Sequence, residues 1–217
     1  MIELARRRMM MGGSALPYDA EVEYIENDGQ CIIDSKVNSN SNLTIEAKFY
    51  IPRITGTIYV QWLYGGRNLN NTIQMQGFLI PPHDTSKTAA ARYYEQITCP
   101  RNYEGIVRVL QSSNVFRELE HNDIVTFNTY SFSLNTSIWI FGFNVSNTDV
   151  PIAYGNTHAG TRLYYWRVFN GTTLLQDLIP VRKGNRGMMY DRVTGQLFDR
   201  IDDGLDAHFI PGPDKTA

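Results

Sequence analysis

The sequence YYWRVFNGTTLLQDLIPVRKGNRGMMYDRVTGQLFD, residues 164–199, predicts consecutive β-hairpins. The pair Asn170-Gly171 tolerates positive φ values, so it is expected to close a tight turn between two antiparallel strands. The returning strand is predicted to begin at Thr173, and Pro180 is expected to end it because proline has no backbone donor for a strand ladder.

A second hairpin is predicted after this strand. Its turn spans 192–195, and it follows a glycine-bounded loop that carries Arg182, Lys183 and Arg186. Apolar side chains of the second hairpin can close one end of a β-sandwich: Met188, Tyr190, Val193, Leu197 and Phe198.

Apolar and polar residues alternate through much of the remaining chain, a pattern typical of strands with one buried face. Asp28-Gly29 predicts a further tight hairpin, and Pro81-Pro82 and Pro151 are expected to end strands. Short strands without an amphipathic helix predict an all-β, two-sheet antiparallel sandwich. The alternating segments are 21–25, 43–51, 57–64, 71–80, 105–111, 123–132, 137–143 and 161–169.

The composition fits one domain and limits the classes of partner. A chain of 217 residues with 42% hydrophobic residues can bury one core. Its net charge of -2 and pI of about 6.1 argue against nucleic-acid binding. No apolar run is long enough to cross a membrane. Cys31 and Cys99 are expected to be two buried thiols rather than a disulfide.

The first fifteen residues differ from the rest. They contain good helix formers followed by Gly12-Gly13-Ser14, and they lack the apolar region of a secretion signal. We predict a short N-terminal arm and hinge at 1–15, followed by one domain at 16–217. The predicted assembly residues of the arm are Ile2, Leu4, Arg6, Arg7, Arg8, Met9, Met10 and Met11.

Both ends of the domain resemble one family. LPYDAEVEYIENDGQCIIDSKV at 16–37 and FNGTTLLQDLIPVRKGNRGMMYDRVTGQLF at 169–198 look like the opening and closing segments of laminin-G-like, concanavalin-A-like jelly rolls. Such domains are found in gut bacteria and their phages. The resemblance implies a jelly-roll sandwich with roles in carbohydrate binding or in virion structure, and one fold hosts many functions.

Aromatic residues are candidates for a glycan platform, because flat rings stack on the apolar faces of sugars. Most aromatics of a sandwich face its core. In the pair Tyr93-Tyr94 one side chain is expected to face outward, because neighbouring strand residues point to opposite faces. The predicted glycan-binding residues are Trp62, Tyr64, Tyr93, Tyr94 and Tyr103.

Two acidic groups are candidate sites. In the first, alternation places Glu118 and Glu120 on one face about 7 Å apart, a spacing that side chains can adjust to a retaining glycosidase pair. The order of the acids and the turn-like residues 121–123 favour a solvated hairpin end, so no catalytic residue is predicted.

The second acidic group is a loop that offers oxygen ligands to calcium. It lacks the spacing of an EF-hand, and a solvated turn is favoured. We therefore predict no metal site and no cofactor, with Ca²⁺ as the alternative. The loop residues are Asp199, Asp202, Asp203 and Asp206.

These observations lead to three hypotheses. The first is a non-enzymatic phage virion protein (capsid decoration, head fibre or tail adhesin), localised to the virion. Its arm would bind other virion proteins, and its domain would form homo-oligomers and contact a cell-surface glycan. The alternatives are a bacterial carbohydrate-binding module and a glycosidase.

Overall fold

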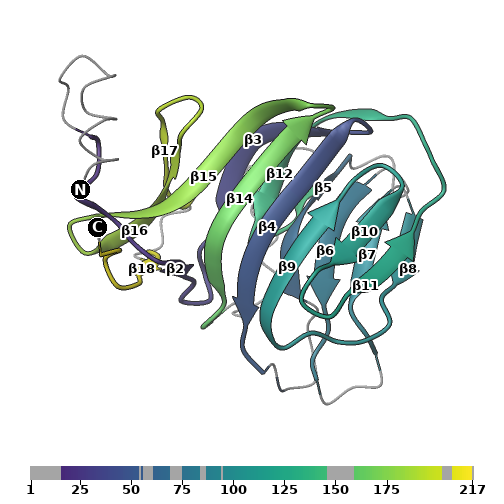
Figure 1. Ribbon diagram of the computed structural model, residues 1–217, viewed down its shortest axis with the longest axis horizontal. Coiled ribbons are helices and arrows are strands. Elements are labelled where there is room, and N and C mark those ends of the chain that lie inside the picture. Colours follow the sequence, from purple (N-terminus) through teal and green to yellow (C-terminus); the bar gives the residue numbers. More distant parts are fainter. Residues whose placement is uncertain are drawn as a thin grey trace.

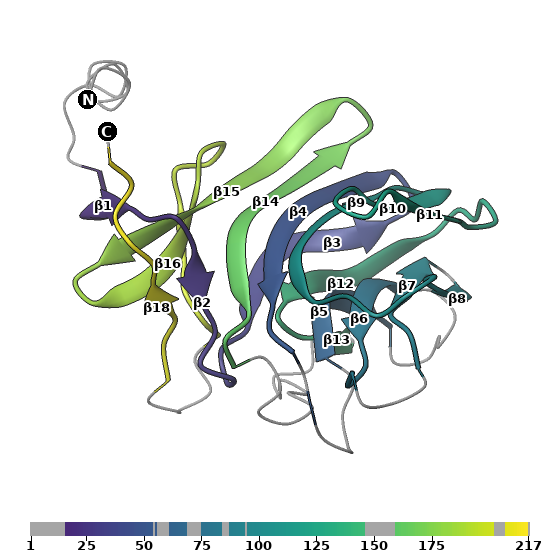
Figure 2. The same ribbon diagram turned by 60° about the horizontal axis from the view of Figure 1, so that its bottom comes forward.

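The chain folds as an all-β sandwich of two antiparallel sheets. The computed structural model describes residues 16–53, 55, 61–68, 75–83, 87–93, 95–145, 159–201 and 207–216. Within them every regular element is a β-strand, and the two sheets pack face to face as in a jelly roll (Figures 1 and 2). The predicted fold class is confirmed, whereas the predicted arm lies outside the described residues.

The larger sheet has 11 strands. Short strands β1 (Ala20–Glu21), β2 (Ile25–Glu26) and β18 (Ile210–Pro211) join it at one end, beside β15, β14 and β2. The main path is β11 (Asp123–Thr126), β10 (Val115–Glu118), β9 (Gly105–Gln111), β4 (Leu43–Ile51), β14 (Arg162–Asn170), β15 (Thr173–Lys183), β16 (Arg186–Asp191) and β17 (Leu197–Phe198).

The smaller sheet has seven strands. Six follow the order β3 (Ile33–Asn40), β12 (Ser133–Ile140), β5 (Gln61–Arg67), β6 (Met75–Ile80), β7 (Ala90–Tyr93) and β8 (Glu95–Thr98). The seventh, β13 (Asn144–Val145), pairs in parallel with β5.

Alternating side chains of the two sheets meet in one core. In β4, Ile45, Ala47 and Phe49 are fully buried, while the residues between them are partly exposed. Aromatic rings bridge the sheets: Tyr64 of β5 lies 5.2 Å from Trp166 of β14, measured between ring centroids. Each large buried side chain contributes about 1.5–3 kcal/mol of hydrophobic stabilisation.

The closing hairpins form as the sequence predicts. Strands β14 and β15 meet at Asn170 and Thr173, with Gly171 at φ +58°. Strands β16 and β17 enclose the turn at 192–195, where Gly195 has φ +77°. Local turn chemistry therefore determined both connections.

The prediction that Pro180 ends its strand is wrong. β15 continues through Pro180 to Lys183, and Pro180 lies opposite Met189 of β16. The pairing between β14 and β15 ends at Leu178, so no donor toward β14 is needed at position 180, and the Pro180 carbonyl accepts a hydrogen bond from Val22 N.

The predicted hairpin at Asp28-Gly29 is also wrong. β2 lies in the larger sheet and β3 in the smaller one, so this segment connects the sheets. The buried Asn27 side chain organises the turn, because its Oδ1 accepts from Gly29 N and Cys31 N and its Nδ2 donates to Cys31 O. A turn-prone pair thus forms part of a crossover.

The first described residues, 16–21, lie against strands β15 and β16 of the closing hairpins. Tyr18 is buried against Tyr190 with 5.0 Å between the ring centroids, and Leu16 packs on the same small cluster. Strand β1 then pairs with β15. The segment before the sandwich is therefore anchored at this end of the larger sheet (Figure 1).

Candidate functional site

Three of the five predicted platform residues lie in the core. Tyr64, Tyr93 and Tyr103 are fully buried, and their hydroxyls are used inside the protein. The Tyr64 hydroxyl donates to Gln111 Oε1 at 2.6 Å, and the Tyr103 hydroxyl donates to Asp123 Oδ2 at 3.1 Å. These side chains cannot form a surface platform.

Of the pair Tyr93-Tyr94, one side chain was predicted to face outward, and the structure describes only Tyr93. Tyr93 faces inward, its hydroxyl donates to the carbonyls of Ser41 and Tyr130, and burial raises its pKa to about 12. Tyr94 lies outside the described residues.

Trp62, the remaining candidate, lies on the outer face of the smaller sheet. It stacks on Phe143 with 4.0 Å between ring centroids and 27° between planes, and Val145 completes this small cluster. Trp62 remains partly exposed. It is thus the one described platform candidate that solvent reaches.

Two paired glycines make room for the stacked rings. Gly65 of β5 lies opposite Gly77 of β6. A Cβ at Gly65 would lie 2.5 Å from Phe143 Cδ2, and a Cβ at Gly77 would lie 2.9 Å from Trp62 Cζ3. Only glycine lets Trp62 and Phe143 lie this close to the sheet.

Two arginines flank the rings. The guanidinium carbon of Arg92 lies 5.4 Å from the Trp62 ring centroid, and that of Arg67 lies 5.8 Å from the Phe143 ring centroid. The pKa of Arg92 is lowered by burial and by the positive charge of Arg67. Trp139 lies opposite Gly65 and is 5% exposed. We call Trp62, Arg67, Arg92, Trp139 and Phe143 the outer aromatic face.

Sequence reasoning missed four members of this face. Glycine inside a strand often marks a close approach of other groups, so Gly65-Gly66 and Gly77 were the available signal. The local sequence does not identify the side chains that lie near these glycines, because Phe143 and Arg92 are remote from the glycines in the chain. Only the tertiary structure brings them together.

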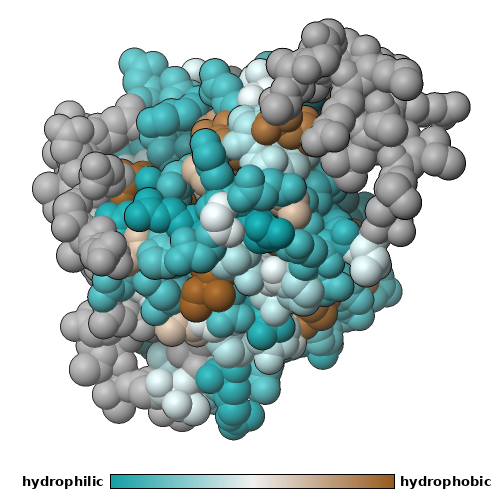
Figure 3. Space-filling view, turned by 90° about the vertical axis from the view of Figure 1, so that its left-hand side faces the viewer, coloured by the Kyte–Doolittle hydropathy of each residue, from teal (hydrophilic) through white to brown (hydrophobic). Residues whose placement is uncertain are grey.

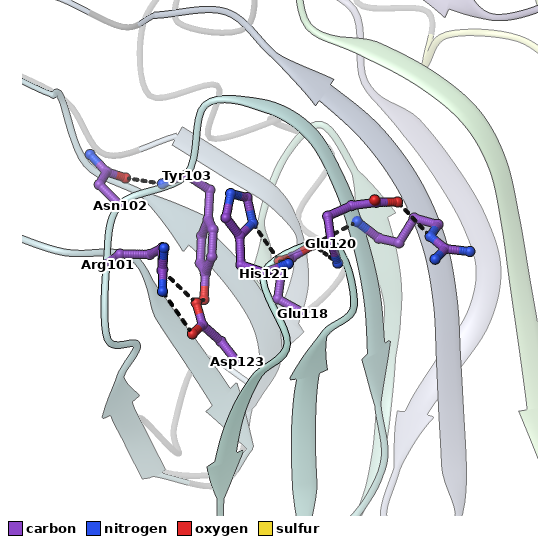
Figure 4. Close-up of polar contacts among 8 residues, drawn as sticks. Arg101, Asn102, Tyr103, Glu118, Glu120, His121 and Asp123 are labelled. Carbon is purple, nitrogen blue, oxygen red and sulfur yellow. Dashed lines mark hydrogen bonds and ion pairs between the residues drawn. The ribbon is translucent and has the colours of Figure 1, made fainter.

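The acidic hairpin end holds its two glutamates in different environments (Figure 4). Glu118 is fully buried, and its carboxylate accepts hydrogen bonds from the backbone N–H groups of Arg108, Glu120 and His121. Its Oε2 also lies 2.7 Å from His121 Nδ1. Glu120 is exposed and pairs with Arg108 at 2.6 Å. The expected solvated end is therefore correct for Glu120 but wrong for Glu118.

A second polar group borders this turn. Asp123 is buried, pairs with Arg101 Nε at 2.8 Å and accepts from the Tyr103 hydroxyl (Figure 4). Burial, followed by the charges of Cys99 and Asp123, raises the pKa of Tyr103. The ion pair and the hydrogen bond give each of these polar groups a partner, and they connect the turn to the segment that precedes β9.

The predicted calcium alternative is only partly described. Asp199 Oδ1 accepts from Arg200 N at 2.7 Å, whereas Asp202, Asp203 and Asp206 lie outside the described residues. Among the residues that the structure describes, no three His, Cys, Asp or Glu side chains are placed to bind a metal ion.

Comparisons with protein-family models and with curated proteins find no match for this chain. In the described residues there is also no helix long and apolar enough to span a membrane.

Proposed function

We propose that this protein is a non-enzymatic adhesion component of a phage virion, whose jelly-roll domain binds a cell-surface glycan. The observation that carries the proposal is the partly exposed Trp62 ring, stacked on Phe143 and flanked by two arginines. Aromatic rings contact the apolar faces of sugars, while guanidinium groups donate to their oxygens.

The environment of Glu118 supports a binding role rather than glycoside hydrolysis. A retaining glycosidase needs two carboxyl groups that reach the substrate. The Glu118 carboxylate is buried and already accepts three backbone N–H groups, so it has no access to a sugar.

The anchoring of Leu16 and Tyr18 supports attachment through residues 1–15. Tyr18 packs against Tyr190, and Leu16 packs on the cluster that these two residues form with Ile179 and Val181. A chain that departs from this point can reach another virion protein without disturbing the sandwich. The neighbouring surface in Figure 3 is mainly hydrophilic where it is coloured, with hydrophobic residues in separate small groups. The proposal therefore assigns assembly to the arm rather than to that surface.

Light scattering tests the structural part of the proposal. The intact chain is expected to form oligomers, whereas a chain starting at Ser14 is expected to be monomeric. Identical monomers would remove the assembly role of the arm and favour a self-contained carbohydrate-binding module. Binding of the intact chain to a glycan array tests the adhesion part, which is refuted if no glycan binds.

A further inference from the structure

Strand β11 forms an open edge of the larger sheet. It ends the main path opposite β17 and pairs with β10 alone (Figure 1). The Phe127 N–H, which follows β11, donates to Asn114 O at 2.9 Å. Backbone groups alternate in direction along an antiparallel ladder, so those of Val125 face β10 and those of Ile124 and Thr126 face away. Apart from the strand ladder, no hydrogen bond among the described residues involves Ile124 or Thr126.

The exposed side chains beside this edge include two large apolar residues. Ile124 is 55% exposed, and Leu119, which follows β10, is 40% exposed. Both lie on the outer face of the sheet, because the buried residues of β10 and β11 alternate with them. The β-branched Ile124 and Thr126 favour an extended backbone. We call Arg117, Leu119, Ile124 and Thr126 the β11 edge.

Three other edges are protected against the addition of a strand. β17 has only two residues, and the C-terminal segment that pairs with β2 contains Pro211 and Pro213, which have no N–H to donate. The edge strand β3 is interrupted at Lys36, where φ is +61°. β11 has neither proline nor lysine, and its register with β10 is continuous. It therefore lacks the features that keep a further strand away.

The charge of the β11 edge indicates which strand it accepts. Arg117 is exposed, lies opposite Ile124, and forms no ion pair among the described residues. The Glu120 carboxylate of the adjoining turn pairs with Arg108 instead. An added strand would lie about 10 Å from β10, so a carboxylate on it and the long Arg117 side chain can meet. Pairing with β11 of a second copy would bring Ile124 and Thr126 to this face and leave Arg117 unpaired.

We propose that the β11 edge binds an extended acidic segment of a partner protein, which adds to the larger sheet as an antiparallel strand. Its backbone hydrogen bonds with Ile124 and Thr126, as in other peptides that extend a sheet. An apolar side chain of the segment packs on Ile124 and Leu119, and a carboxylate pairs with Arg117. This interaction goes beyond glycan binding and is independent of it, because the outer aromatic face belongs to the smaller sheet.

Fluorescence anisotropy with labelled synthetic peptides and the intact protein tests the interaction. The acidic peptide is Thr-Glu-Val-Val-Val-Glu-Thr, and the basic peptide has lysine in place of both glutamates. The acidic peptide is expected to bind at least about fivefold more tightly, because attraction to Arg117 becomes repulsion, and added salt reduces the difference. The acidic peptide with N-methyl groups on both glutamates and the central valine is expected not to bind, because those N–H groups face β11.

Four variants locate the site. Thr126→Pro removes an outward N–H that the β10 ladder does not use, and edge strands tolerate proline there. Thr126→Pro and Ile124→Ser are each expected to weaken binding of the acidic peptide at least about fivefold. Arg117→Gln is expected to bind both peptides alike. Val193→Ser changes another exposed apolar residue, is the matched control and should retain the parent affinity. Near-ultraviolet circular dichroism checks that each variant retains the parent fold.

Each outcome decides one part of the proposal. Strand addition is overturned if no peptide binds, if the N-methylated peptide binds as tightly as the acidic one, or if a folded Thr126→Pro variant keeps the parent affinity. Equal affinity for the acidic and basic peptides overturns the acidic partner. Light scattering tests a second copy as the occupant: dimers of a chain starting at Ser14 that disappear in Thr126→Pro would assign the edge to self-association instead.

Discussion

Replacing Glu118 by glutamine is predicted to destabilise the fold strongly, although the two side chains have the same shape. The Glu118 carboxylate accepts from Arg108 N at 3.0 Å, Glu120 N at 3.1 Å and His121 N at 2.8 Å, and it contacts His121 Nδ1 at 2.7 Å. In the Glu118→Gln variant an NH₂ group must replace one carboxylate oxygen, so it faces groups that donate hydrogen bonds.

The magnitude follows from the contacts that are lost. Either orientation of the amide removes two contacts, and a hydrogen bond to a charged group contributes about 1.5–3 kcal/mol. After relaxation of the turn we expect a loss of about 3 kcal/mol in the free energy of unfolding. For a domain of this size, that loss corresponds to a fall in Tm of about 6–12 °C.

Glu120→Gln is the matched control, because it makes the same change two residues later on the same turn. The Glu120 side chain is exposed and pairs with the exposed Arg108 side chain, so the loss of this ion pair is expected to cost less than about 1 kcal/mol. Calorimetry and urea unfolding of both variants provide the comparison. Equal destabilisation of the two variants would refute the view that burial makes Glu118 a structural carboxylate.

Three further predictions concern the core and the turns. Gly65→Ala is expected to lose about 1–3 kcal/mol in urea unfolding because its Cβ meets Phe143, and an unchanged midpoint would contradict this close packing. Burial raises the pKa of Cys99 from 9.0 to about 12, so its stabilising contribution is complete below pH 9 and is lost as the pH rises toward 12. The fall in stability of the parent between about pH 9 and pH 10.5 should therefore be shallower in Cys99→Ala, and parallel curves would count against this cause. Asp191→Ala removes an acceptor for Asp177 N, Val193 N and the Thr194 hydroxyl, with an expected cost of about 2–4 kcal/mol by urea unfolding; a cost below about 1 kcal/mol would disprove the role of Asp191 in this turn.

Local patterns were sufficient to predict the all-β class and the closing hairpins. Alternation has a period of two, as has the side-chain direction along a strand, so it identifies strands without knowledge of their neighbours. Turns such as those at Gly171 and Gly195 depend on φ angles that glycine adopts at little cost. Such information lies within a few residues of the chain.

Sheet membership and the direction of individual aromatic side chains depended on remote residues. Alternation does not say which face of a strand becomes the core, so Tyr64 of β5 could be read as a surface residue although it is buried. A register shift between Trp62 and Tyr64 further places both Leu63 and Tyr64 in the core. A second shift leaves Tyr164 and Tyr165 both partly exposed.

The candidate site was likewise predicted only in part from the sequence. Trp62 was identifiable as a large aromatic residue in a strand, but its partner Phe143 and the flanking arginines come from distant segments. Residue types and their periodicity thus specify strands and turns, because those are local properties of the backbone. Pairing between strands specifies the outer aromatic face, because β5, β6, β7 and β12 become neighbours only when the smaller sheet forms.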